Sequence, residues 1–453
     1  MVWSTESTIS REVLSKPGFV DYDCPLNGRG PEVDLNRVLR EALVDRLALS
    51  DASPKSLLNT REFKAREWDR AADWLRDSGI ALYFLQRLKD TNSSEVVPPR
   101  ILDRLQANYD LNRQRIASMA NAFSVLNQKF NNAGVRYAVV KGFSLVPDFC
   151  LDPCLRVQSD LDYLIDEESF GRAEEIVLHA GYSWTHRVGH EVMYSPSSLR
   201  KARSEEDQFR PDVLHTIELH LGIVDTEHDL PLGERPFVTQ SVKRSTWNGS
   251  TFYALQEEEG FLLQVRHAFI HLVNYWPRLS WLFEIGHFLK CKVNDNEFWA
   301  RLEQTIGDNA VLRDVVVVVA ELSAQIFRTP LSSTLRDWSE TLRPGARVWI
   351  ENYGREWILA AAPGAIFRPF SPSKLVLFLH QQFMSDEASQ AKSSRVWLLH
   401  PPRLKRVVGS IRKKPLLMID SHYWWRGLFH ANSGLRYLLE VPRWRYLNRR
   451  ALR

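Results

Sequence analysis

The segment RVQSDLDYLID, residues 156–166, constrains the fold of this chain more than any other stretch. As a strand it would alternate between an apolar face, made of Leu161, Tyr163 and Ile165, and a second face made of Asp160, Asp162 and Leu164. Two carboxylates side by side near a core repel each other, raise each other's pKa and cost stability unless a cation lies between them. The segment therefore predicts a buried strand that contributes to a metal site.

Helical periodicity dominates the chain on both sides of this strand. Residues 31–134 contain stretches with apolar residues at spacings of three and four, and two of these stretches end in glycine, as helices often do. From residue 257 the pattern is helical again, with proline or glycine breaks near residues 277, 330, 344 and 363. The run VVVVVA at 315–320 is far too short to span a membrane and predicts a buried helix.

A short α/β pattern lies between the two helical regions. VRYAVV at 135–140 predicts a buried strand, and a short helix, the Asp-x-Asp strand and a helix over 167–180 follow it. Further strand-like segments lie around 182–194 and 213–224. We therefore expect an α+β protein, with an α/β-type core and a small mixed sheet flanked by helical regions. The expected parts are an N-terminal helical region (1–132), the α/β core (133–255), a C-terminal helical region (256–395) and a basic, tryptophan-containing tail (396–453).

The turn KGFS follows the first predicted strand and is expected to open a helix. Backbone N–H groups at such a turn, together with the helix dipole, face an anion. Gly142 would let the backbone pass close to a ligand, Ser144 would donate to a phosphate, and Lys141 would compensate its charge. Each also has a structural interpretation, because serine is a good N-cap, with Pro147 still in the first turn, and a lone lysine is often a surface residue.

The segment VLHTIELHLGIV, residues 213–224, alternates in the same way, and its polar face carries Thr216, Glu218 and His220. If this strand lies beside the Asp-x-Asp strand, Glu218 becomes a third carboxylate of the site. Hard oxygen ligands of this kind suit Mg²⁺, which takes its remaining ligands from water and from substrate phosphates. Two such ions activate an attacking hydroxyl and stabilise a leaving pyrophosphate, which is the chemistry of nucleotidyl transfer.

Together these motifs resemble the polymerase-β-like nucleotidyltransferase superfamily, and within it a family of uncharacterised bacterial nucleotidyltransferases. The family pattern runs Lys-Gly-x-x-Leu, then Arg-x-x-(Ser/Gly)-Asp-(Ile/Leu)-Asp, then Ile-Glu-x-His. The matching positions are Lys141, Gly142, Leu145, Arg156, Ser159, Asp160, Asp162, Glu218 and His220. The resemblance covers residues 133–224 and extends to HAFIHL and RLSWLFEIGHFL in the following helices. It departs from the superfamily where Phe143 precedes Ser144, and from the family where Glu284 replaces an Asp.

The resemblance implies a nucleotidyltransferase core and a role for each matching residue. Asp160, Asp162 and Glu218 would hold Mg²⁺, and Glu218 would complete the catalytic metal site or take the proton from the acceptor hydroxyl. The nucleotide would be bound by Lys141, Gly142, Ser144, Arg156 and Ser159. Arg156 has an alternative, as the structural partner of Asp152 or Asp166.

Three further residues are expected near the acceptor or behind the acidic residues. His220 would orient Glu218 or touch the acceptor, although a histidine on a strand is often only structural. His271 and Glu284 come from the helical segments and would lie on the acceptor side. His267 and His271 are four residues apart on a helix, but without an HExxH pattern we favour packing or acceptor contact over a zinc site.

The leading hypothesis is a Mg²⁺-dependent enzyme that moves a nucleoside monophosphate from an NTP, with ATP the expected donor. Its acceptor would be a hydroxyl or phosphate of a sugar, a small natural product or a protein side chain. The alternative is a non-catalytic nucleotide-binding or interaction module that retains the fold. Three acids on polar strand faces favour the enzyme, because a degenerate site has no reason to keep them.

Cysteine content and charge indicate the setting of the chain. Cys24, Cys150, Cys154 and Cys291 form neither a disulfide framework nor paired metal motifs, so we expect a reducing, cytoplasmic location, with no signal peptide and no transmembrane segment. Residues 401–453 carry thirteen Lys or Arg against two acids, a net +11, which leaves −7 for residues 1–400. With three tryptophans, this tail would meet an anionic partner or membrane surface, unless it is only the solvated face of a terminal helix.

Overall fold

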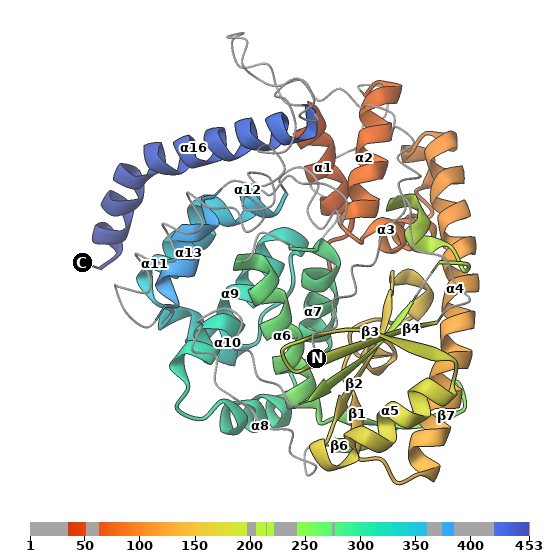
Figure 1. Ribbon diagram of the computed structural model, residues 1–453. Helices are drawn as coiled ribbons and strands as arrows, with labels where there is room; N and C mark the ends of the chain where they lie inside the picture. The colour runs from red at the N-terminus through yellow and green to blue at the C-terminus, as the bar shows by residue number, and fades with distance from the viewer. Residues whose placement is uncertain are drawn as a thin grey trace, which may run out of the picture. The chain divides into compact units, whose positions relative to one another are not determined.

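A seven-stranded mixed sheet carries the Asp-x-Asp strand in its middle. Its strands are β1 (Tyr137–Val139), β2 (Asp160–Ile165), β3 (Tyr182–Val188), β4 (Glu191–Pro196), β5 (Thr216–Leu221), β6 (Val242–Trp247) and β7 (Ser250–Leu255). They are ordered β3-β4-β5-β2-β1-β7-β6 in this computed structural model (Figure 1). β2 pairs with β5 and β1 with β7 in parallel, and the other pairs are antiparallel.

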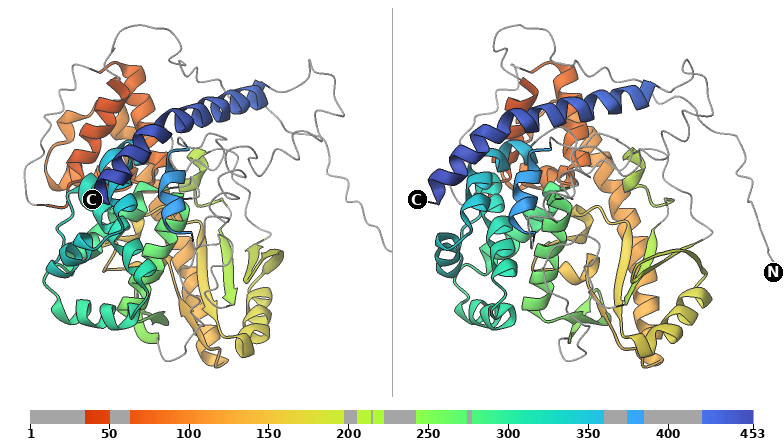
Figure 2. Two further views of the ribbon diagram at one scale, coloured as in Figure 1. Left: turned by 90° about the vertical axis from the view of Figure 1, so that its left-hand side faces the viewer. Right: turned by 60° about the vertical axis from the view of Figure 1, so that its left-hand side comes forward.

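Helices cover both faces of the sheet (Figures 1 and 2). On one face, α4 (Pro99–Asn132) and α5 (Phe170–His179) pack on the predicted apolar side of β2, in a core that includes Phe123, Phe130, Val177, Leu161, Tyr163 and Ile165. On the other face, α6 (Glu257–Val273) reaches β1, where the Gln264 amide donates to the Val140 carbonyl at 3.0 Å. The polar side of β2 therefore faces the helices that follow the sheet in sequence.

A second, larger apolar core joins helices from both ends of the chain. It is formed by α1 (Leu35–Arg46), α2 (Ala65–Asp77), α3 (Ala81–Asp90) and later helices, whose bounds are α7 (Leu279–Cys291), α8 (Asn296–Ile306), α9 (Ala310–Phe327), α10 (Ser333–Glu340), α11 (Pro344–Trp349), α12 (Arg355–Ile358), α13 (Val376–Gln382) and α16 (Ser421–Ala451). The valines at 315–319 lie in α9 and are fully buried, as predicted.

The expected α+β class is confirmed, one local expectation is wrong and one element was missed. No α-helix follows the KGFS turn, because the chain forms only short 3₁₀ turns at Gly142–Leu145 and Pro153–Leu155 before β2. The hairpin of β6 and β7 was not anticipated, although Asn248-Gly249 at its tip is a strong hairpin signal. Both residues of that turn have positive φ, 46° and 76°.

The structure describes residues 35–50, 63–196, 205–213, 215–221, 242–273, 277–359, 374–384 and 421–452. All of them belong to one unit that spans residues 35–453, and the division into parts at residues 132, 255 and 395 stays a prediction. Cys24 and the part of the tail before residue 421 lie outside the described residues. None of the helices within the described ranges is long and apolar enough to cross a membrane.

Candidate active site

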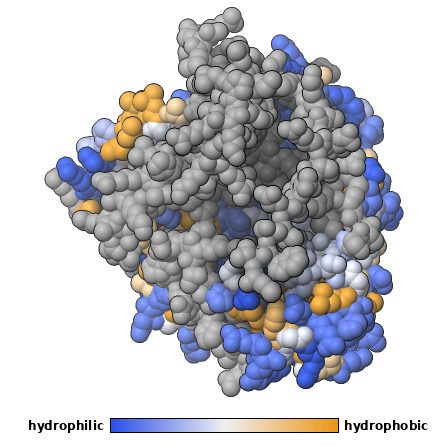
Figure 3. All heavy atoms as spheres, in the orientation of Figure 1, coloured by the Kyte–Doolittle hydropathy of each residue, from blue (hydrophilic) through white to orange (hydrophobic). Residues whose placement is uncertain are grey.

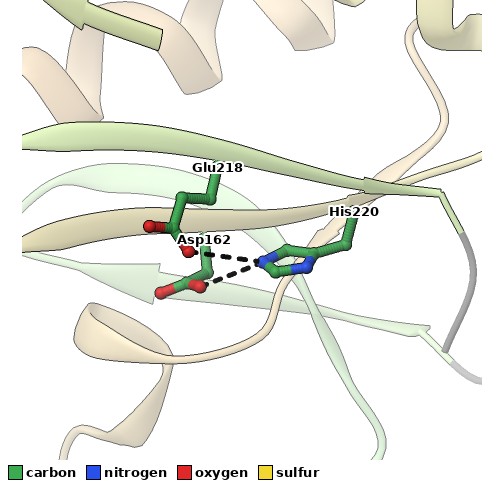
Figure 4. Close-up of side chains that lie close together, drawn as sticks. All are labelled: Asp162, Glu218 and His220. Atoms are coloured by element: carbon green, nitrogen blue, oxygen red, sulfur yellow. Dashed lines mark hydrogen bonds and ion pairs between the residues drawn. The ribbon is translucent and has the colours of Figure 1, made fainter. Parts of the chain in front are cut away.

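The register between β2 and β5 brings the acidic residues of the two strands together. Asp162 pairs with Glu218 and Leu164 with His220, so the two carboxylates and the imidazole share one face of the sheet (Figure 4). A ligand atom from each of Asp162, Glu218 and His220 lies within 4.8 Å of the others. The expectation that Glu218 joins the Asp-x-Asp strand is therefore met by a direct in-register contact.

His220 connects the two carboxylates of this trio. Its Nε2 lies 3.0 Å from Asp162 Oδ1 and 3.9 Å from Glu218 Oε2, as the dashed lines in Figure 4 show. Its Nδ1 lies 3.9 Å from a carboxylate oxygen of Glu191. His220 therefore orients Asp162 first, rather than Glu218 alone.

The second oxygen of Asp162 fits the role of a cation ligand. Asp162 Oδ2 is buried and has no hydrogen-bond partner within the described part of the chain. An ionised oxygen left in this state costs free energy unless a cation takes it up. Together with the Glu218 carboxyl group, it offers the hard oxygen ligands that Mg²⁺ prefers.

Lys141 forms an ion pair with the same aspartate. Its Nζ lies 2.8 Å from Asp162 Oδ1, and the lysine side chain is 20% exposed whereas that of Asp162 is fully buried. Burial would lower the pKa of Lys141, but Asp162, Asp160 and Glu218 together raise it above its usual value. Lys141 is therefore charged, and it is a counter-ion of the acidic cluster rather than a surface lysine.

The three carboxyl groups do not share the negative charge equally. Burial would raise the pKa of Asp162, but Lys141 and His220 hold it well below its usual range. Burial, Asp162 and Asp160 raise the pKa of Glu218 to about 10, so this carboxyl is uncharged at neutral pH when no cation is bound. The pKa of Asp160 is also raised, by burial and by Asp162.

Asp160 lies at the start of β2 and is not part of the close trio. It pairs in register with Thr216, and the Ser159 hydroxyl donates to its Oδ2 at 3.2 Å. Asp160 is partly exposed to solvent, whereas Asp162 is 2% exposed. The structure thus places Ser159 and Asp160 at the open end of the acidic face and Asp162 at its buried end.

The KGFS turn packs closely against Gln158 at Gly142. Gly142 has a φ of 58°, and a Cβ at this position would overlap the Gln158 side-chain amide. That amide donates to the Asp160 carbonyl at 2.8 Å, so the missing side chain of Gly142 lets the turn pack against the start of β2. The Ser144 hydroxyl donates to the Lys141 carbonyl at 3.1 Å and does not cap a helix.

Arg156 and Glu284 form a buried ion pair that sequence reasoning did not pair. Arg156 Nε lies 3.1 Å from Glu284 Oε1, and the hydroxyl of Tyr83 donates to the same oxygen at 2.8 Å. The alternative partners expected for Arg156 are wrong, because Asp166 pairs with Arg136 and Asp152 accepts from the Cys154 backbone N–H. The Nη atoms of Arg156 have no hydrogen-bond partner among the described residues, so they stay free for an anion.

Comparison with protein families identifies the family of the chain. A family described as "Uncharacterised nucleotidyltransferase" matches residues 64–324, more than half of the chain. The chain belongs to this family. The matched range contains every strand of the sheet and all of the site residues named above, whereas α16 lies beyond it. Membership in this family implies that the protein is a transferase and that its substrate is a nucleotide.

Two further comparisons add little to the nucleotidyltransferase assignment. None of the curated proteins matches the chain. Among solved structures, it is similar to the crystal structure of an antigenic nucleotidyltransferase-like protein from Paracoccidioides brasiliensis, at 13% identity over 47% of this chain and 94% of that chain. The TM-score of 0.26 is too low for this likeness to support any argument about the fold or the site.

Two histidines of α6 form an aromatic cluster near the acidic residues. The ring centroids of His267 and His271 are 4.4 Å apart, and each lies 4.7 Å from the ring of Trp281 in α7. Burial lowers the pKa of His267 well below its usual value, and the nearby charge of Lys141 lowers it further. His267 is thus a neutral residue beside the acidic cluster, and His271 packs against its ring and against Trp281.

Arg278 was not singled out from the sequence, although it begins the RLSWLFEIGHFL segment that resembles the nucleotidyltransferase family. It is the residue before α7, where its carbonyl accepts from the Trp281 backbone N–H at 3.2 Å, and its side chain makes no hydrogen bond or ion pair with any residue in the described ranges. Burial and the charge of Arg156 lower the pKa of its guanidinium group, and Asp160 and Glu284 partly offset this. The Arg278 side chain is therefore a buried cation without a direct ion-pair partner among the described residues, and Asp160 and Glu284 are the acids that partly balance its charge.

Proposed function

We propose that this protein is a Mg²⁺-dependent nucleotidyltransferase of the polymerase-β-like superfamily. It would move a nucleoside monophosphate from an NTP, with ATP the expected donor, to a hydroxyl or phosphate acceptor. A sugar, a small natural product or a protein side chain would serve as the acceptor. The observation that carries the proposal is the in-register pair of Asp162 and Glu218, with Asp162 Oδ2 buried and left without a partner in the described structure.

The acidic residues would hold the cation. We assign Asp162 and Glu218 as ligands at the buried end and Asp160 as a ligand at the open end, where the nucleotide's phosphates would arrive. His220 fixes the orientation of Asp162 through its 3.0 Å contact. When bound, Mg²⁺ would neutralise the triphosphate and polarise the phosphoryl group under attack.

Basic residues on the edge of the site would bind the phosphates of the donor. Lys141 lies at the turn with Gly142 and Ser144, and its Nζ is already within the site. Arg156 is held through Nε by Glu284, which leaves its Nη atoms to contact an anion. Arg278 adds a second guanidinium group without a described partner. This separation of charge, with acids on the sheet and cations at its edge, suits a metal–triphosphate complex.

In the transfer step, an acceptor oxygen would form a bond to the α-phosphorus while the bond from that phosphorus to the bridging oxygen of pyrophosphate breaks. The acceptor's proton must leave with the attack. Glu218 is uncharged at neutral pH in the protein without a cation, so it must release its own proton before it acts as a ligand or a base. His271, Trp281 and the helices after the sheet would form the acceptor side, and we expect the reaction to occur in the cytoplasm.

The decisive experiment combines nucleotide binding with turnover. The purified protein is heated with ATP, GTP, CTP or UTP, with and without Mg²⁺, and pyrophosphate release is followed in the presence of pooled acceptors. A nucleotide at one hundred times its Kd adds about 2.7 kcal/mol of stability, which shifts the melting temperature measurably. We expect one nucleotide to stabilise the protein only with Mg²⁺ and to release pyrophosphate.

Glu218→Gln is the most informative variant, because the glutamine amide replaces a carboxyl group that is already uncharged without metal. It should fold like the wild type but lose Mg²⁺-dependent turnover, as should Asp160→Asn. Glu297→Gln is the matched control, since the Glu297 side chain is 93% exposed. Nucleotide stabilisation without pyrophosphate release would favour the non-catalytic binding module, and no stabilisation by any NTP would refute the proposal.

A further inference from the structure

The helix α16 exposes a stripe of large apolar side chains. Leu435, Leu438, Leu439 and Tyr446 of α16, and Leu452 directly after it, are between 55% and 71% exposed. Leu435, Leu439 and Tyr446 are separated by four and seven residues, so they share one face of the helix. Single exposed apolar residues are ordinary, but several along one face of a helix are typical of an interaction surface.

The opposite face of α16 is fixed to the rest of the structure. Tyr437 and Trp444 are each 6% exposed, and both stack on Phe378 of α13 at centroid distances of 4.6 and 4.7 Å. The hydroxyl of Tyr353 donates to Glu440 at 3.1 Å. Because this face is already buried, the helix cannot turn its leucines inward without losing these contacts.

Arginines border the apolar stripe on both sides. The helix carries Arg436, Arg443, Arg445, Arg449 and Arg450 after residue 430, against the single acid Glu440. Arg436 pairs with Glu356 and Arg443 with Glu440, but Arg445, Arg449 and Arg450 form no ion pair with the described residues. Figure 3 shows orange side chains beside blue ones at the upper left, where α16 runs in Figure 1.

We propose that this face of α16 docks on an anionic lipid surface. A membrane interface provides a partner for both kinds of side chain: its acyl region can bury the leucines, and its phosphate groups can pair with the arginines. The aliphatic parts of the arginine side chains can lie along the apolar stripe. A protein partner would instead need a surface with an apolar strip bordered by acidic residues. The docking face lies outside residues 64–324, so it is independent of the transferase proposal.

The test is co-sedimentation of the full-length protein with vesicles. Wild type should bind vesicles of phosphatidylcholine mixed with phosphatidylglycerol, and should not bind pure phosphatidylcholine. Each arginine near an anionic surface contributes about a factor of five to the affinity, so Arg445→Gln, Arg449→Gln and Arg450→Gln combined should weaken binding roughly a hundredfold. Leu435→Gln, Leu438→Gln and Leu439→Gln combined should reduce it by about tenfold or more.

A matched control separates this surface from general hydrophobicity. Val125→Gln and Leu178→Gln change apolar residues that are 40% and 44% exposed on α4 and α5, and binding should be unchanged. All variants alter exposed side chains, so their melting temperatures should match the wild type. Equal vesicle binding by the wild type and the leucine variant would overturn the proposal. A wild-type dimer that the leucine variant converts to a monomer, without vesicle binding, would do the same and would identify a second copy as the occupant.

Discussion

Replacing Lys141 with methionine tests the charge balance of the acidic site directly. Methionine keeps most of the length of the side chain and removes its charge. The Nζ of Lys141 lies 2.8 Å from Asp162 Oδ1, and the aspartate side chain has no exposure to solvent. In the variant without metal, Asp162 would be a buried carboxylate with only His220 as a partner among the described residues.

The expected cost follows from the burial of this pair. Removing one partner of a buried ion pair destabilises a protein by about 3 to 5 kcal/mol, and we take the lower end because Lys141 is partly exposed. An unfolding entropy of about 2.1 cal/mol/K per residue over roughly 420 residues gives about 0.9 kcal/mol/K. The melting temperature in metal-free buffer should therefore fall by about 3 °C.

The same substitution should strengthen cation binding, because the lysine no longer competes for Asp162. A titration with Mn²⁺ followed by electron paramagnetic resonance, together with melting temperatures at increasing Mg²⁺, checks this. Mg²⁺ should stabilise Lys141→Met more than the wild type. Lys129→Met, an exposed lysine on α4, is the control and should stay within about 0.5 kcal/mol of the wild type. A Lys141→Met protein that is as stable as the wild type without metal, and gains no more from Mg²⁺, would refute this reasoning.

Three further predictions concern the residues around the site. Glu284→Gln should leave the buried Arg156 guanidinium group without its counter-ion and lower the free energy of unfolding in urea by about 3 kcal/mol. Gly142→Ala should cost more than Gly181→Ala, because both have positive φ, worth about 1 to 2 kcal/mol, but only Gly142 has a side chain in the way. Burial and Arg115 lower the pKa of His215 to about 4 from 6.5. Below pH 6.5 the unfolded chain therefore binds a proton at His215, whereas the folded protein binds it only below about pH 4. The free energy of unfolding should fall by up to about 3 kcal/mol as the pH is lowered over that range. His215→Gln should remove this loss.

Each of these predictions has an outcome that contradicts it. An unchanged urea midpoint for Glu284→Gln would mean that Arg156 is solvated. Equal losses for the two glycine variants would mean that Gln158 moves aside at no cost. A His215→Gln protein with the wild-type slope of stability between pH 4 and 6.5 would show that another group titrates there.

Local features of the fold followed from the sequence because they depend on short-range geometry. The apolar and acidic faces of β2 are a consequence of strand alternation, and Leu161, Tyr163 and Ile165 are indeed buried against α4 and α5. The burial of the valine run in α9 was also predictable, because five consecutive valines leave no polar face for solvent. The β6–β7 hairpin was also predictable in principle, from Asn248-Gly249. The turn after Lys141 begins no α-helix, since Gly142 has a φ of 58°, outside the right-handed helical region.

The sequence by itself determined which residue types face the site: paired acids on one strand, an acid and an imidazole on another, and a lysine before a glycine. Only the tertiary structure decided which of them touch. The β2–β5 register joins Asp162 to His220 across 58 residues, and helix packing joins Arg156 to Glu284 across 128. Alternation is written in neighbouring residues, but a charged group's partner depends on which segments pack together and exclude water, and no local pattern encodes that choice.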